Sequence, residues 1–228
     1  MSQLLFFDLD DTLIDHLGAE EGAQRETFET FPALYAGLSF DVWIGRYRTV
    51  NRVLWGAYGR GEIDRHTLQH QRFRQPLHEL ALDAGQAHVV GTFYMQTYRR
   101  HWRLNEGAEE ILEDAARLGI VGVVSNGFVE TQHAKMKRFR LDRWVKHLVL
   151  SEDVGAMKPA RAIFDAAVRT VGHAAIERKV YIGDSFEHDV VGAKGAGWLP
   201  VLYNPSGKPM PSPVLYVKRL LDLKPLLE

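Results

Sequence analysis

The chain has 228 residues, of which 46% are apolar and 25% charged, and a formal net charge of −1. This length and composition predict one large or two unequal globular domains. The near-zero charge gives no general attraction to nucleic acids or anionic membranes, so neither is expected as a partner. The lack of cysteine excludes disulfides, thiolate zinc sites and a cysteine nucleophile.

The N-terminus shows no sign of a targeting segment. Met1 leads directly into an apolar run, without the basic region or the cleavage site of a secretory signal. No apolar stretch approaches the roughly 20 residues that span a bilayer. We therefore expect a cytoplasmic protein. Its oligomeric state, monomer or homodimer, stays open.

The first predicted element is a buried strand over residues 3–8, which contains four consecutive apolar residues. A long helical region follows, from 17 to 103. Apolar residues recur there at spacings of three and four, as in Val50, Val53 and Leu54, and glycines divide the region into about four helices. No strand is expected in this region.

From residue 104 the pattern alternates between helices and short apolar strands. Helices are expected within 106–119, 128–139, 159–172 and 187–197, and strands within 120–127, 145–155, 179–185, 198–205 and the start of 214–228. Nearly continuous apolar strands between helices are typical of a parallel sheet that is covered on both faces. We therefore predict an α/β fold, a Rossmann-like parallel sheet with helices on both faces. Residues 1–16 and 104–228 would form this core, and 17–103 an inserted all-α cap domain.

Polar residues follow the predicted strands where each of them ends. Open parallel sheets bind ligands beyond the carboxyl ends of their strands, so these residues are expected to converge on one site. The set comprises Asp8, Asp10 and Thr12, then Ser125, Asn126 and Gly127, then Lys158, and finally Asp184, Ser185 and Asp189.

This set suits phosphoryl transfer through an aspartyl-phosphate. Asp8 would attack phosphorus, and Asp10, on the same side of an extended segment, would act as general acid and then as general base. Mg²⁺ suits an all-oxygen site and would relieve the repulsion between Asp8 and Asp184. Lys158 and the groups around Ser125 would hold the phosphate oxygens.

Four segments, "DLDDT", "VVSNG", "GAMKP" and "GDSFEHD", resemble in this order the four motifs of the haloacid dehalogenase-like hydrolase superfamily. The helical region 17–103 resembles the α-helical cap of that superfamily. The resemblance implies a nucleophile, an acid/base, a supporting contact, phosphate contacts and a magnesium site. Asp8 would be the nucleophile, Asp10 the acid/base, and Thr12 the supporting contact. The phosphate contacts would come from Ser125, Asn126, Gly127 and Lys158. The magnesium site would be formed by Asp8, the Asp10 carbonyl, Asp184 and Asp189.

Within the superfamily, the cap segment 47–73 is similar to a subgroup of bacterial 5′-nucleotidases. These enzymes act on pyrimidine and noncanonical nucleoside monophosphates. The similarity implies that Asn51, Trp55 and Arg72 contact the substrate, and that the chain hydrolyses nucleoside 5′-monophosphates.

The same segments also allow other interpretations. A calcium loop starting at Asp8 is excluded, because Leu13 stands where such a loop needs glycine. Ser125 and Asn126 could also cap a helix, Lys158 could be a surface lysine, and Asp189 could be an ordinary early-helix acid.

Other chemistries of the same superfamily are also conceivable. A sugar-phosphate phosphatase and a β-phosphoglucomutase-like phosphotransferase remain open, because both keep the same four motifs. A haloacid dehalogenase is disfavoured, because Asp10 stands where that branch resembles a tyrosine. A phosphonatase needs a cap lysine, and the first lysine of the chain is Lys135. A non-catalytic phosphate-binding protein is disfavoured by the presence of both Asp8 and Asp10.

Overall fold

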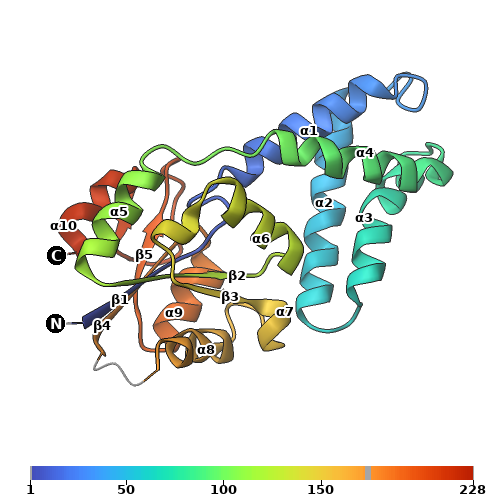
Figure 1. Cartoon of the computed structure of the whole chain (residues 1–228). Helices are drawn as coiled ribbons and strands as arrows, with labels where there is room; N and C mark the ends of the chain where they lie inside the picture. The colour runs from blue at the N-terminus through green and yellow to red at the C-terminus, as the bar shows by residue number, and fades with distance from the viewer. Residues whose placement is uncertain (1, 173–175, 228) are drawn as a thin grey trace. The chain divides into compact units, whose positions relative to one another are not determined.

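The structure is a computed structural model that describes residues 2–172 and 176–227. The chain divides into two compact units. We call them the core unit, Met1–Asp15 with Arg103–Glu228, and the cap unit, His16–Trp102. The chain thus leaves the core unit after its first strand and returns to it some 90 residues later (Figure 1).

The described part of the core unit contains a parallel sheet of six strands in the order β3-β2-β1-β4-β5-β6. The strands are β1 (Ser2–Phe7), β2 (Ile120–Ser125), β3 (His147–Leu150), β4 (Ile176–Gly183), β5 (Leu199–Tyr203) and β6 (Tyr216–Val217). β1 pairs with β2 on one side and with β4 on the other, so the strand order reverses at β1. Such a switch point is where open α/β sheets bind their ligands.

Helices connect these strands. They are α5 (Ala108–Leu118), α6 (Val129–Arg138), α7 (Ser151–Val154), α8 (Arg161–Val171), α9 (Gly192–Gly195) and α10 (Lys224–Leu227). Short turns of other helix types are η2 (Leu141–Arg143), η3 (Phe186–Val191) and η4 (Leu220–Leu223), of which η3 is a π-helix.

The side chains of β1 alternate between two apolar layers. Leu5 and Phe7 pack into a layer formed with α5, α6, η4 and α10, whereas Leu4 and Phe6 pack into a layer formed with α8 and α9. All four are fully buried, and each contributes roughly 1.5–3 kcal/mol to folding. Both faces of the sheet are therefore covered, which explains why the strands read as nearly continuous apolar runs.

The predicted α/β fold class is confirmed, and the structure adds one local difference. The segment 187–197 was expected to be an ordinary helix, but its first part belongs to the π-helix η3. The N–H of Val190 donates to the carbonyl of Ser185, five residues earlier (3.2 Å). Such wider turns occur often at functional sites, and this one carries Asp189.

The cap unit consists of helices packed around aromatic side chains. The helices are α1 (His16–Thr30), α2 (Phe40–Gly59), α3 (Arg65–Glu79), the short turn η1 (Ala84–Gln86) and α4 (Ala87–Arg100). Tyr47, Phe73 and Tyr94 form the centre, with ring centroids 5.2–6.0 Å apart. These rings come from three different helices, so aromatic packing ties the unit together.

Among the described residues, none of the helices combines the length and the hydropathy that a bilayer-spanning segment needs.

Candidate active site

Asp8 follows directly after β1, at the carboxyl end of the sheet and at its switch point. Its N–H donates to the carbonyl of Ile182 (2.8 Å), which continues the pairing between β1 and β4. The chain then turns, because the N–H groups of Leu13 and Ile14 both donate to the carbonyl of Leu9. Asp8 is thus held by the sheet and is 6% exposed.

Lys158 is the cation that accompanies Asp8. Its Nζ donates to Asp8 Oδ1 (2.5 Å), to Asp189 Oδ1 (2.7 Å) and to Tyr181 Oη (2.9 Å). All three N–H donors of the ammonium group are therefore used. Burial alone would lower the pKa of Lys158, but the charges of Asp189 and Asp8 hold it well above its usual value.

Asn126 holds the backbone at Lys158. Its Nδ2 donates to the carbonyl of Lys158 (3.0 Å), and its Oδ1 accepts from the N–H of Lys158 (2.8 Å). The sequence predicts that Asn126 contacts phosphate. The structure shows its side-chain amide bonded to the loop that carries Lys158, and the phosphate contact stays a prediction.

Asp189 is buried on the π-helix, and both of its oxygens have partners within the protein. Oδ1 accepts from Lys158, and Oδ2 accepts from the N–H of Ser185 (2.9 Å). Gly183 leaves the room for this carboxylate, since a Cβ atom at Gly183 would lie 2.3 Å from Asp189 Cγ. Asp189 is therefore placed to orient Lys158.

Asp184 completes a cluster of three carboxylates. One oxygen from each of Asp8, Asp184 and Asp189 lies within 4.8 Å of the others. Asp184 is partly exposed and has no hydrogen-bond or ion-pair partner in the described ranges 2–172 and 176–227. The cluster holds three acidic groups against the single ammonium of Lys158.

Asp8 and Asp184 have raised pKa values, mainly because both carboxyl groups are buried. Burial, opposed by Lys158, raises the pKa of Asp8 from 3.8 to about 7. Burial, together with the charges of Asp8 and Asp189, raises the pKa of Asp184 to about 9. A dication bound by Asp8 and Asp184 would reverse both shifts. The oxygen donors and their unbalanced charge thus fit a hard cation such as Mg²⁺.

Asp10 is held by two residues that the pattern of polar residues at strand ends does not predict. Its Oδ2 accepts from Gln132 Nε2 (2.8 Å), and its Oδ1 pairs with the ammonium of Lys135. Gln132 and Lys135 stand three residues apart on α6 and are both buried. The sequence contains an indication of this role. Gln132 and Lys135 are three residues apart, so they lie on one face of α6, and the face of a helix that packs on a sheet is expected to be apolar.

Ser125 ends β2 and receives two hydrogen bonds. Its Oγ accepts from Gln132 Nε2 (2.7 Å) and from the N–H of Gly127 (3.2 Å). Gly127 also leaves space for Gln132, since a Cβ atom at Gly127 would lie 2.0 Å from Gln132 Nε2. The structure therefore connects Ser125, Gly127 and Asp10 through the Gln132 amide.

Thr12 lies in the turn after β1 and is fully buried. Its carbonyl accepts from Asn105 Nδ2 (2.9 Å), while its Oγ1 has no partner in the part of the chain that the structure describes.

The cap candidates belong to the other unit. Asn51 and Trp55 lie on α2, and Arg72 lies on α3. Arg72 stacks over the rings of Phe73 and Tyr94, each 5.3 Å from its guanidinium carbon, and no carboxylate of residues 2–172 and 176–227 pairs with it. The Oδ1 atom of Asn51 is buried and lacks a hydrogen-bond partner in those same ranges. Both side chains therefore retain polar capacity.

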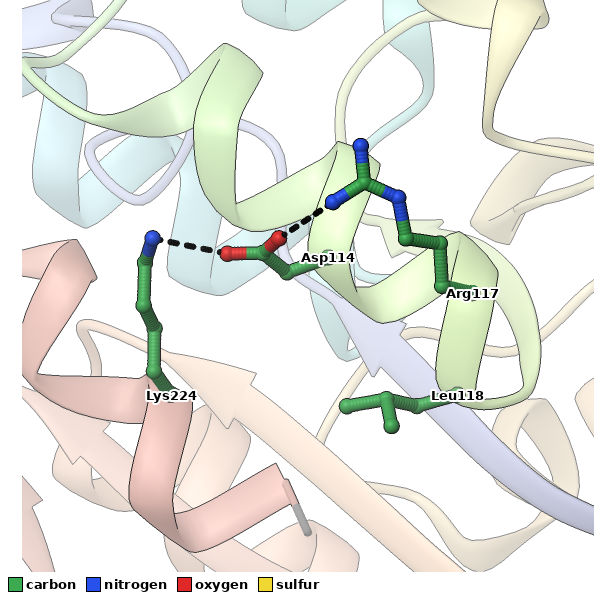
Figure 2. A pocket seen from close by; sticks show the side chains of 4 residues that line it. All are labelled: Asp114, Arg117, Leu118 and Lys224. Atoms are coloured by element: carbon green, nitrogen blue, oxygen red, sulfur yellow. Dashed lines mark hydrogen bonds and ion pairs between the residues drawn. The ribbon is translucent and has the colours of Figure 1, made fainter.

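A surface hollow of the core unit lies elsewhere, against α5 and α10 (Figure 2). Asp114 bridges Lys224 (2.8 Å) and Arg117 (3.0 Å) there, and Leu118 completes the lining. Leu118 precedes β2 by two residues, so the hollow lies toward the amino ends of the strands. Asp114 carries one negative charge against the two positive charges of Arg117 and Lys224, and the lining includes none of the predicted site residues.

Comparison with known proteins agrees with this architecture. The protein YfnB of Bacillus subtilis (strain 168) is 30% identical over 98% of this chain and 94% of its own length. A crystal structure of YfnB bound to magnesium matches 99% of this chain and 98% of its own, with a TM-score of 0.83 and 28% identity.

Two further relatives carry named activities. Pyrimidine 5′-nucleotidase YjjG of Escherichia coli (strain K12) is 29% identical over 98% of this chain and 96% of its own length. Glyceraldehyde 3-phosphate phosphatase of Pyrococcus abyssi (strain GE5 / Orsay) is 28% identical over 89% of this chain and 82% of its own length. The family model of haloacid dehalogenase-like hydrolases matches residues 3–197, so this chain is a hydrolase that belongs to that family.

Proposed function

We propose that the chain is a magnesium-dependent phosphomonoester hydrolase that acts on nucleoside 5′-monophosphates through an aspartyl-phosphate. The observation that carries this proposal is the pairing of Asp8 with Lys158 inside a cluster of three carboxylates at the switch point of the sheet. A nucleophilic carboxylate beside a fixed ammonium group suits attack on an anionic phosphoryl group.

Asp8 would open the reaction by attacking phosphorus, which breaks the bond to the ester oxygen, while Asp10 gives its proton to that leaving oxygen. Asp10 would then take a proton from water as the water oxygen attacks the phosphorus of the acyl-phosphate. Inorganic phosphate leaves, and the carboxylate of Asp8 is restored. Lys158 would neutralise charge on the transferring group in both steps.

The metal would be held by Asp8, Asp184 and the backbone carbonyl of Asp10, with Asp189 outside the ligand set because Lys158 and Ser185 occupy its oxygens. When bound, Mg²⁺ offsets the repulsion between the nucleophile and the phosphate. The raised pKa values of Asp8 and Asp184 support this assignment, because a bound dication would favour the ionised form of both carboxylates.

Ser125 would donate its hydroxyl proton to a phosphate oxygen. A hydroxyl group has two acceptor positions and one donor. Both acceptor positions of Ser125 are filled, by Gln132 and by Gly127, so its remaining capacity is to donate. A phosphate oxygen of the bound substrate would be the acceptor.

The substrate class rests on the relatives and on the cap unit. YjjG is named a pyrimidine 5′-nucleotidase, which favours a nucleoside 5′-monophosphate. Arg72 and Asn51 retain hydrogen-bonding capacity that a base or sugar could use, and Trp55 offers an aromatic face. We place substrate selection on 17–103 and the phosphoryl chemistry on 1–16 with 104–228.

A sugar-phosphate phosphatase is the second candidate, because a relative from Pyrococcus abyssi is named a glyceraldehyde 3-phosphate phosphatase. The same core chemistry would serve both substrates.

The experiment measures phosphate release from a panel of nucleoside 5′-monophosphates and sugar phosphates, with Mg²⁺ and with a chelator. We expect release that needs Mg²⁺ and is fastest with pyrimidine nucleotides. Asp8→Asn should abolish it while leaving the circular dichroism spectrum unchanged. Asp165→Asn, an exposed carboxylate on α8 that pairs with Arg161, is the matched control and should keep full activity.

Near-wild-type release by Asp8→Asn would overturn the mechanism. Release from sugar phosphates alone would keep the mechanism and move the substrate to the second candidate. A sugar bisphosphate product would identify a phosphotransferase instead.

A further inference from the structure

The helix α6 brings a buried polar pair, Gln132 and Lys135, to the acidic turn after β1. Lys135 is 1% exposed, although lysine is among the residues least often buried. Burying an ammonium group is costly unless a carboxylate pairs with it, and its partner is Asp10. An apolar side chain at position 135 could pack equally well without the cost of burying a charge. The Lys135–Asp10 ion pair therefore needs an explanation other than packing.

Gln132 and Lys135 together occupy both oxygens of the Asp10 carboxylate. Gln132 Nε2 donates to Oδ2, and Lys135 Nζ pairs with Oδ1. A carboxylate held at both oxygens has a fixed side-chain orientation, whereas a side chain that is 25% exposed would otherwise sample several rotamers.

Gln132 has a second partner, the hydroxyl of Ser125 at 2.7 Å. Its Nε2 has two protons, so the two contacts use both of them. The bond to Ser125 fills an acceptor position of that hydroxyl and leaves the hydroxyl proton to point elsewhere. Gln132 therefore fixes the orientation of two groups that come from different strands.

We propose that Gln132 and Lys135 are positioning residues, which hold the Asp10 side chain in one orientation for its proton transfers and keep Ser125 as a hydrogen-bond donor. This inference rests on the proposed function, because it assigns the two residues to the acid step of that reaction. Neither residue touches the substrate; each acts through Asp10 or Ser125.

The test uses two substrates that differ in their need for a proton. The ribose oxygen of uridine 5′-monophosphate leaves poorly without protonation, whereas p-nitrophenolate leaves as a stable anion. Losing a well-placed general acid should therefore harm the first substrate more. The value to compare is kcat/KM, which reports on the steps up to formation of the acyl-phosphate.

The variants are Lys135→Met and Gln132→Met, with Asp10→Asn as the reference for a missing acid. Methionine keeps the length and the apolar stem of both side chains, so the helix should stay folded, as thermal unfolding will show. Lys137→Met is the matched control, since this exposed lysine lies on the same helix and has no ion-pair partner in the described part of the chain.

We expect Lys135→Met to lower kcat/KM about 100-fold with uridine 5′-monophosphate and less than about tenfold with p-nitrophenyl phosphate. Gln132→Met should show the same preference and should also raise KM several-fold, because Ser125 would be free to turn away from the phosphate. Lys137→Met should behave as wild type with both substrates.

Two results would overturn the inference, and they differ from each other. In the first, Lys135→Met and Gln132→Met lower kcat/KM equally on both substrates, while Asp10→Asn lowers it more for uridine 5′-monophosphate. The proposed function would then stand, and the role of Gln132 and Lys135 would be structural only. Equal losses in Asp10→Asn itself would remove the acid role of Asp10 from the proposed function, and the inference with it.

Discussion

The side-chain amide of Asn126 and the backbone of Lys158 bond to each other in both directions, at 3.0 and 2.8 Å. Asn126 follows β2, and Lys158 lies in the loop between α7 and α8, 32 residues later. The amide therefore ties this loop to the carboxyl end of β2. The ammonium group of Lys158 can then reach Asp8 and Asp189 together.

Asn126→Ala should release this loop. We expect kcat to fall at least tenfold, because Lys158 would no longer be held against Asp8, and the free energy of unfolding to fall by about 1–3 kcal/mol for the two lost hydrogen bonds. Phosphate release and urea denaturation measure the two effects.

A matched control exists in the same unit. Asn204, after β5, makes the same two-way contact with Lys208, at 2.9 and 3.1 Å. Asn204→Ala should cost similar stability and leave kcat unchanged. An equal loss of kcat in both variants would show that the effect at Asn126 reflects general destabilisation.

Gly183→Ala should disturb Asp189. The added Cβ atom would lie 2.3 Å from Asp189 Cγ, so the carboxylate must move away from Lys158. We expect activity to fall at least tenfold and stability by about 1–3 kcal/mol, which is typical of overpacking. Gly195→Ala, where no atom lies within 4 Å of the new methyl group, should be neutral or slightly stabilising. Full activity in Gly183→Ala would mean that Asp189 is not needed to orient Lys158.

The stabilising effect of Mg²⁺ should grow with pH. The folded-state pKa values of Asp8 and Asp184, about 7 and about 9, exceed the ordinary value of 3.8. The folded protein then retains protons that the unfolded chain has lost, so the metal-free protein loses stability as pH rises from about 4 toward 9. Mg²⁺ binds the ionised carboxylates and offsets this loss.

Thermal unfolding with and without Mg²⁺ checks this expectation. The rise in Tm on adding the ion should be larger at about pH 9 than at about pH 5, provided that unfolding is reversible at both values. An equal rise at both pH values would argue against binding by these two carboxylates.

Asp184→Asn should separate stability from metal binding. The amide is never charged, so the metal-free variant avoids the cost of ionising a buried acid beside Asp8 and Asp189. We expect a higher Tm than wild type at about pH 9 without metal, and no further rise when Mg²⁺ is added. Calorimetric titration with Mg²⁺ measures the second effect directly; retained affinity would remove Asp184 from the metal site.

The order and type of the core elements could be predicted from the sequence. Strands buried on both faces must be apolar throughout, and Leu4–Phe7 shows this within four residues. Parallel strands end at one edge of the sheet, so Asp8, Ser125 and Asp184 could be assigned to one site without knowledge of the strand order. The helical insert could be recognised because the strand pattern stops for about 90 residues.

The contacts among these residues depend on the tertiary structure. Lys135 and Asp10 are 125 positions apart, and they meet only because α6 turns one particular face toward the sheet. The π-helix that carries Asp189 could not be expected either, because a single shifted hydrogen bond leaves no pattern in the sequence.

Which residues gather at the carboxyl edge follows from the order of strands and polar residues along the chain, because parallel strands bring the residues at their ends to that edge. Their hydrogen-bond partners depend on the packing of the helices. Asn126 bonds to the backbone of Lys158, Asp189 has both oxygens occupied whereas Asp184 has no hydrogen-bond partner among the described residues, and Asp10 is held from α6. The physical reason is that a hydrogen bond depends on distances of a few tenths of an ångström, which follow from how helices pack on the sheet.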